Sequence, residues 1–365
     1  MPRRLARCAP LLILLVLASP ASAKPLGGTQ AGASPWQSVN GRLPARNGKA
    51  RVETRPRAFR AFALDRAALE DALAGAPREG AKRAHRSTAI VSIPAPDGTL
   101  VRFRTVNSPV MEAGLARRHP DIHTYAGSGV DDPAASVRFD ISPAGFHASV
   151  RDARGAWYVD PYYGGDQSVY VSYLGDDLDN VHGPLVEPEA IGPAAPRRAG
   201  RPAHRAGEEV IQRIYRLAFL TDPSYASYFA GQGVTVAQAN AVLINRVNQV
   251  YNDDLGIKMM LIASNDAVNL DTQAEFSGAN GPCGATACFP SATVSCVSST
   301  LTQNQNAVDT IIGAANYDIG HIGVAAGGGG IASLGVVGQD GVKARGCTGV
   351  PTPKGDLYAV DYVAH

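Results

Sequence analysis

The sequence predicts an α/β fold over residues 210–365, preceded by a β-rich region over residues 87–175. In the C-terminal part, strand-like and helix-like runs alternate, which predicts a sheet with helices packed on it. In the N-terminal part, short β-rich runs follow one another with turns between them, a pattern typical of antiparallel sheets. A stretch rich in Pro and Arg over residues 176–209 separates the two parts and is expected to be an extended linker open to proteases.

The first residues have the pattern of a secretory signal peptide. Three arginines precede the apolar run from Leu11 to Ala18, and Ala21-Ser22-Ala23 is a small-residue cleavage site. The apolar run is too short to span a bilayer, and no other run approaches spanning length. We therefore predict a signal peptide over 1–23, no membrane span, and a secreted protein that is extracellular or periplasmic.

Residues 24–86 are rich in Gly, Pro, Ala and Arg, and we expect a region of low order with one helix, from Asp65 to Leu73. A hairpin is predicted over residues 88–106, because two β-rich runs flank the turn signal Asp97-Gly98. A short helix follows, and the next β-rich runs complete the predicted β-rich region: Ile122 to Tyr125, Ala135 to Ile141, Phe146 to Arg151, Trp157 to Val159 and Ser168 to Leu174.

The α/β region starts with a strand from Val210 to Leu220, and its best helix runs from Val236 to Leu255 with Gly256 as the terminating glycine. A strand over residues 257–263 and a long Cys-bearing loop follow. We expect Thr302 and Gln305 to form a capping box for a second helix. Two short strands, His321 to Ala325 and Ile331 to Val337, then bracket a run of four glycines.

The four cysteines of the exported chain are Cys283, Cys288, Cys296 and Cys347. An even number in an exported protein predicts two disulfides, whose pairing the sequence does not give. A zinc knuckle is the alternative, and the spacings of five and eight fit no common zinc motif.

Charge divides the chain into unlike halves. Residues 206–365 carry 7 Lys and Arg against 13 Asp and Glu, net −6, so that residues 1–205 carry +8 of the total of +2. The two halves could therefore associate electrostatically. The arginines are scattered among Pro, Gly and Ala without interleaved aromatic residues, which argues against nucleic-acid binding. We expect Asp253 and Asp254 to lie at a solvated helix end and His321 to be structural.

The final stretch, from Leu357 to His365, has apolar residues at helical spacing: Leu357, Val360, Val363 and Ala364. Asp356 precedes it as a predicted N-cap. His365 lies off this stripe, four residues after Asp361. Because a domain seldom ends inside a helix, we expect the natural chain to continue beyond this residue.

Tyr362-Val363-Ala364-His365 resembles the start of the His-Glu-x-x-His-x-x-Gly-x-x-His zinc helix of reprolysin-like (adamalysin-type) metzincin metalloproteases. The order of elements over residues 210–365 is similar to the N-terminal subdomain of that catalytic domain, a twisted mixed sheet with two helices and the start of the zinc helix. The matching runs are Ile244 to Tyr251, Leu255 to Ile257, Tyr317 to His321 and Ile331 to Gly335. Residues 87–175 resemble the pro-segment of bacterial precursors of this type, most clearly at Pro120 to Gly127 and Gly145 to Ala148.

The resemblance implies a secreted Zn²⁺-dependent endopeptidase precursor whose substrates are proteins or peptides and whose own pro-segment is a partner. His365 would be the first zinc ligand, and the glutamate base and two further histidines would follow it, so this chain is expected to be inactive by itself. The edge strand for substrate would be Ile331, Ala332, Ser333, Leu334 and Gly335. Residues 24–205 contain no cysteine that could block zinc, and we therefore expect the pro-segment to inhibit by occlusion.

The alternative is a non-catalytic secreted binding or inhibitor protein with a degenerate metalloprotease-like domain. Other enzyme classes lack their motifs. Ser333 has no Gly-x-Ser-x-Gly elbow around it, and the glycine run is followed by a predicted strand where a dinucleotide-binding motif requires a helix.

Overall fold

The computed structural model describes residues 34–365 apart from 46–47, 49, 179–210 and 328. The predicted signal peptide at 1–23 and nearly all of the predicted linker lie outside these residues. By its contacts the chain divides into Met1–Ser34 and Pro35–His365, and every strand and helix of the structure belongs to the second unit. Within the described residues, no helix combines the length and apolarity needed to cross a membrane.

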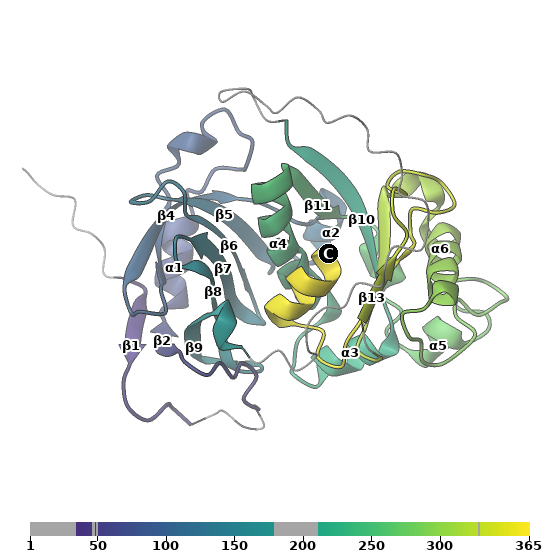
Figure 1. The fold of residues 1–365 in the computed structure, drawn as a ribbon, viewed down its shortest axis with the longest axis horizontal. Helices are drawn as coiled ribbons and strands as arrows, with labels where there is room; N and C mark the ends of the chain where they lie inside the picture. The colour runs from purple at the N-terminus through teal and green to yellow at the C-terminus, as the bar shows by residue number, and fades with distance from the viewer. Residues whose placement is uncertain (1–33, 46–47, 49, 179–210, 328) are drawn as a thin grey trace, which may run out of the picture. The chain divides into compact units, whose positions relative to one another are not determined.

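A nine-stranded antiparallel sheet forms the N-terminal part of this unit (Figure 1). Its strand order is β1-β2-β9-β8-β7-β6-β5-β4-β3, so β3 to β9 form a meander. The bounds are β1 Trp36–Val39, β2 Arg60–Leu64, β3 Ile90–Pro94, β4 Leu100–Asn107, β5 His123–Gly129, β6 Ser136–Ser142, β7 Gly145–Asp152, β8 Gly155–Tyr163 and β9 Asp166–Leu174. The predicted hairpin is β3 and β4, and the five strands predicted after it are β5 to β9.

The sheet begins earlier in the chain than we predicted. β1 and β2 lie within residues 24–86, where we expected low order, and β2 joins the sheet by pairing with β9. The aromatic rings of Trp36 and Phe62 are buried in the core of this sheet, and Trp36 meets Phe146 edge-on at 5.2 Å between centroids. The residues that make these contacts are distant in sequence. The pattern of residues 24–86, which are rich in Gly and Pro, therefore did not predict β1 and β2.

A second, five-stranded sheet has the order β11-β10-β12-β14-β13. Its strands are β10 Arg213–Thr221, β11 Ile257–Leu261, β12 Ile319–Val324, β13 Gly329–Ala332 and β14 Gly346–Gly349. The first four in this order are parallel, and β13 at the edge is antiparallel to β14. The fold is therefore mixed α/β, as predicted. β13 is shorter than the predicted strand from Ile331 to Val337.

Both faces of the five-stranded sheet are covered. Along β10, Leu217 and Phe219 belong to one hydrophobic core, and Ala218 and Leu220 belong to another. Successive side chains of a strand point to opposite faces, so the two cores lie on opposite sides of the sheet. This explains why β10 reads as a continuous apolar run at its end.

The α-helices are α1 Arg66–Leu73, α2 Ala113–Arg118, α3 Pro223–Ala230, α4 Val236–Leu255, α5 Gln273–Ser277 and α6 Ser298–Ile312. Single turns are η1 Ala84–Arg86, η2 Gly175–Asp177, η3 Asn265–Val268 and η4 Ala314–Asn316, and the C-terminal helix is η5 Leu357–Ala364. The predicted capping box at Thr302 was wrong, because α6 begins one turn earlier, after Val297. The Gln305 side chain is buried and bonds instead to Tyr317 and the Ala344 N–H.

Helix α4 lies between the two sheets, with contacts to β6 on one side and β11 on the other (Figure 1). A capping box of Thr235 and Gln238 begins it, and Gly256 ends it in the left-handed conformation at φ 64°. Almost every residue from Val236 to Gln249 is buried, polar ones included. Leu255 at its end is 61% exposed.

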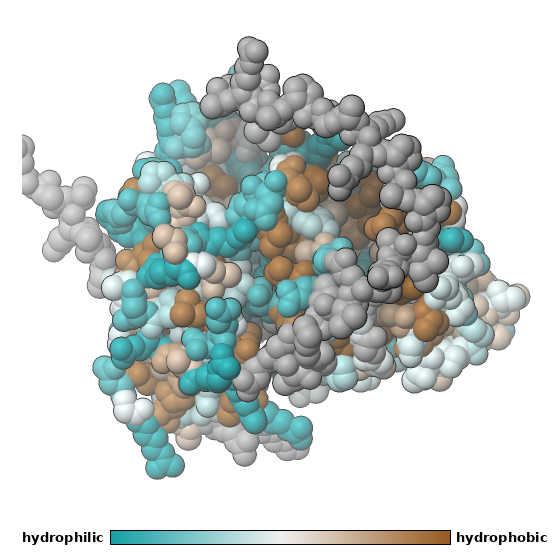
Figure 2. Space-filling model, viewed as in Figure 1, coloured by the Kyte–Doolittle hydropathy of each residue, from teal (hydrophilic) through white to brown (hydrophobic). Residues whose placement is uncertain are grey.

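Hydrophobic surface is visible between the two sheets, in the region of α4 and β10 (Figure 2). Large exposed hydrophobic residues include Ile214 of β10 and Leu255 of α4.

Candidate functional site

The C-terminal helix η5 packs on α4 and carries the residues that the sequence singled out. It is a π-helix, and Asp356 at its start is itself helical and makes no side-chain cap, so the predicted N-cap was wrong. The residues of η5 that are fully buried are Tyr358 and Ala359, and the predicted stripe is only partly buried. The wider turn of a π-helix changes which side chains face the core, and this explains the difference.

His365 is exposed at the end of this helix. The Tyr251 hydroxyl of α4 donates to the Ala364 carbonyl at 2.5 Å and so holds the residue before it. Burial raises the pKa of the Asp361 carboxyl, and the nearby His365 opposes that rise.

A protein zinc site needs at least three ligand side chains. Within the described residues, no three His, Cys, Asp or Glu side chains converge on a point that could hold a metal. His365 by itself does not make a zinc site, and no catalytic step follows from the described residues alone.

The predicted substrate strand is only partly a strand. Ile331 and Ala332 belong to β13, and the Ser333 N–H extends the pairing by donating to the Arg345 carbonyl at 2.9 Å. Leu334 is 92% exposed in a turn, and Gly335 there has φ 71°. One edge of β13 pairs with β14, and β13 adjoins η5. The structure therefore brings the predicted edge and the helix ending at His365 together, although that edge is shorter than expected.

The four cysteines form two disulfides, Cys283–Cys288 within the loop before α6 and Cys296–Cys347. The second ties this loop to β14, the neighbour of β13, across 51 residues of sequence. His321 is structural, as expected. Its Nε2 lies 2.9 Å from the Thr348 hydroxyl, its ring stacks on Phe219, and burial lowers its pKa to about 4.

The N-terminal part of the chain closes the opposite edge of the five-stranded sheet. The Leu261 N–H of β11 donates to the Val110 carbonyl at 2.8 Å, and the Glu112 N–H donates to the Leu261 carbonyl at 2.9 Å. The Glu112 side chain also accepts from the Ala263 N–H at 2.7 Å. The segment 110–112 thus pairs with β11 as a further short parallel strand.

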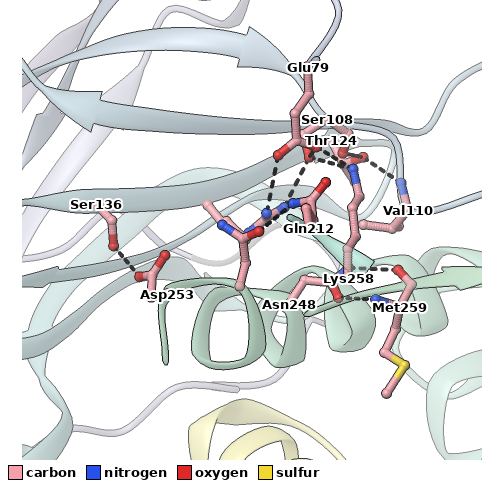
Figure 3. A network of polar contacts seen from close by, with 12 residues as sticks. Glu79, Ser108, Val110, Thr124, Ser136, Gln212, Asn248, Asp253, Lys258 and Met259 are labelled. Atoms are coloured by element: carbon pink, nitrogen blue, oxygen red, sulfur yellow. Dashed lines mark hydrogen bonds and ion pairs between the residues drawn. The ribbon is translucent and has the colours of Figure 1, made fainter. Parts of the chain in front are cut away.

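A buried ionic network lies beside this pairing (Figure 3). The Lys258 ammonium of β11 points toward the nine-stranded side, where it donates to Glu79 and, at 3.0 Å, to the Ser108 hydroxyl. Arg138 donates to the same hydroxyl at 3.0 Å. Burial lowers the pKa of Lys258, and the Glu79 carboxylate opposes that shift.

Further ion pairs join the two parts, and three of them contact α4 or the segment before η5. Arg246 of α4 donates to Asp160 of β8, with both side chains buried, and Lys354 pairs with Glu53 at 2.6 Å. Arg151 pairs with Asp254 at 3.0 Å. In the two more buried pairs, the cation (Arg246 or Lys354) belongs to the acidic C-terminal half. The net charges of the two halves therefore did not predict which half supplies the cation.

Asp253 and Asp254 are not simply solvated. Asp253 accepts from the Ser136 hydroxyl at 2.6 Å, and both residues thus bind the nine-stranded sheet. The signal that sequence reasoning missed was the set of polar residues on α4, among them Asn245, Arg246 and Gln249, whose burial requires partners on a second surface.

Comparison with known proteins gives one family. The family described as "Metallo-peptidase family M12B Reprolysin-like" matches residues 234–365, from the turn before α4 to the last residue. No curated protein is similar enough to count as a match. The C-terminal part of this chain, residues 234–365, therefore matches the reprolysin-like metallopeptidases.

Proposed function

We propose that the protein is the precursor of a secreted zinc-dependent endopeptidase and that residues 210–365 are the N-terminal part of its metzincin catalytic domain. The observation that carries this proposal is the family match, which spans α4, the β13 edge and the helix that ends at His365. The two disulfides are compatible with export.

In this proposal His365 is the first zinc ligand, and a glutamate and two further histidines follow it in the complete protein. When bound, zinc would supply an activated water for peptide hydrolysis. β13 would hold the substrate in extended form, because an edge strand can add a peptide as a further strand. Because β13 is short, the predicted residues that pair as a strand are Ile331 and Ala332, and the backbone of Ser333 continues the pairing.

The direct test is to determine the coding sequence beyond codon 365 and to express the complete protein. We expect glutamate at the next position and histidines four and ten positions after His365. Zinc content and casein digestion should both disappear in His365→Ala. His321→Ala is the matched control, because its ring lies at the β12–β14 contact and should affect stability without abolishing zinc binding. A complete protein that is free of zinc and does not digest casein would favour the non-catalytic binding protein.

We further propose that residues 35–178 act as the pro-segment. The support is the pairing of segment 110–112 with β11 and the ion pairs that cross to α4, β11 and Lys354. These contacts lie at the β11 edge and near the start of η5, whereas the proposed substrate edge is β13. Occlusion of the active site stays a prediction.

The experiment is to cut the complete protein within residues 179–210 and to follow casein digestion before and after gel filtration. If the pro-segment inhibits, the cut protein stays inactive while the two pieces elute together, and digestion begins once they separate. Full activity of the uncut chain would contradict the proposal.

A further inference from the structure

A cavity of about 450 Å³ lies between the nine-stranded sheet and α4. Its walls include β7 to β9, one face of α4, the segment from Thr352 to Leu357 that leads into η5, and residues 53–55 before β2. The exposed residues Arg55 and Thr352 lie among its lining, so it can be reached from solvent. This volume falls within the range of sites for small molecules.

The α4 wall is apolar along most of its length and cationic at one end. Ala239, Val242, Leu243 and Arg246 all line the cavity, because positions three, four and seven apart share one face of a helix. Phe229 extends the apolar surface. The cavity therefore offers an apolar body and a charged end within the same space.

Arg246 has more donors than partners. Its side chain is 6% exposed, one terminal nitrogen, Nη2, donates to Asp160, and its Nε and Nη1 have no hydrogen-bond partner. Its guanidinium also lies over the Tyr158 ring at 5.2 Å. Buried donors without partners are rare in folded proteins because leaving them unsatisfied is unfavourable. A ligand with acceptor oxygens would satisfy them.

The anionic groups around the cavity have partners of their own. Glu53 pairs with Lys354 at 2.6 Å, and Asp140 pairs with His147 at 3.0 Å. Asp356 contributes a buried oxygen, Oδ1, without a partner, and burial raises the pKa of this carboxyl. Among the residues that line the cavity, the buried donors without a partner are Nε and Nη1 of Arg246.

We propose that this cavity binds a small carboxylic acid with an aliphatic body, whose carboxylate meets Arg246 and whose chain lies along Ala239, Val242 and Leu243. Arginine suits a carboxylate because its planar donors bond to it in fixed geometry. The proposal is independent of peptidase activity. Since both parts of the chain line the cavity, a bound acid would also favour their association by mass action.

The test is calorimetric titration of the chain with octanoate and with octan-1-ol, which has the same chain length and no charge. We expect octanoate to bind at one site at least about tenfold more tightly than the alcohol, because hydrogen bonds to a charged acceptor are the stronger ones. Equal affinities, or no saturable binding of octanoate at millimolar concentration, would overturn the proposal. So would tighter binding of inorganic phosphate, which has no aliphatic body.

Two variants of α4 locate the site. Val242→Phe fills the cavity and should weaken octanoate binding about tenfold or more, whereas Leu255→Phe places the same ring at the exposed end of the same helix and should change nothing. Arg246→Lys keeps the charge and loses the planar donors, so it should bind octanoate more weakly. Unchanged affinity in Val242→Phe would show that octanoate binds elsewhere and would reject this cavity, and thermal unfolding of each variant verifies its fold.

Discussion

Leu261 of β11 donates its N–H to the carbonyl of Val110 at 2.8 Å, and this bond joins the edge of the five-stranded sheet to the N-terminal part of the chain. An uncovered edge strand offers its backbone groups to other chains. Here segment 110–112 occupies that edge, and Val110, Met111 and Leu115 enter the same hydrophobic core as α4. The two parts are therefore joined by backbone pairing, apolar packing and buried charge together.

Lys258 should be essential to this junction. Lys258→Met leaves Glu79 with only the more distant Arg138 at 3.6 Å, and because removing one partner of a fully buried pair destabilises by about 3–5 kcal/mol, we expect a loss below that range. Urea unfolding of the two proteins measures the difference. The control is Arg102→Met, which breaks an exposed pair with Asp131 and should leave the midpoint nearly unchanged. Equal effects of the two substitutions would mean that the buried pair contributes no more to the free energy of unfolding than the exposed pair.

The two disulfides should contribute unequally. Cys296–Cys347 closes a loop of 51 residues and Cys283–Cys288 a loop of 5. The chain-entropy relation then gives stabilisation of about 4 and about 2 kcal/mol, respectively. Replacing each pair by alanine and comparing thermal unfolding tests this order. A larger loss from the short loop would contradict the entropic account.

Acid should weaken the β12–β14 contact through His321. Burial lowers its pKa in the folded protein to about 4, from an ordinary value near 6.5. The folded state therefore favours the neutral ring, and the contribution is complete above pH 6.5 and is lost as the pH falls toward 4. The loss should reach about 3 kcal/mol. Unfolding free energies of wild type and His321→Gln, measured from pH 7 to 4, should converge on acidification, and parallel curves would exclude His321 as the cause.

Thr235 caps the start of α4, whereas Thr302 caps no helix. Thr235→Ala removes the cap of α4, whose hydroxyl accepts from the Gln238 N–H at 3.3 Å, and should destabilise by about 1 kcal/mol. Thr302 lies inside α6, so Thr302→Ala should be neutral or slightly stabilising because alanine is the better helix former. Chemical denaturation of both variants measures the contrast, and the reverse order would restore the predicted capping box at Thr302.

Much of the fold could be predicted because it depends on neighbours in sequence. The turn at Asp97-Gly98 and the glycine after Leu255 act locally, and the hairpin β3–β4 and the end of α4 were predicted correctly. β1 and β2 were missed, since two of the rings that pack on Trp36 in the core, those of Phe146 and Tyr170, lie more than a hundred positions away. The start of α6 was predicted wrongly because the residue types of a capping box, here Thr302 and Gln305, can also occur inside a helix.

For the candidate site, the sequence by itself determined the family pattern that ends at His365 and the number of disulfides, whereas the edge strand begins inside the glycine run and not after it. These depend on residue type and spacing along the chain. Only the tertiary structure decided the pairing of the cysteines, the closure of β11 by segment 110–112, and the burial of Arg246 against Asp160. Each of these depends on which distant surfaces meet, because a buried charge or an unpaired strand edge is stable only where a partner is brought to it through space.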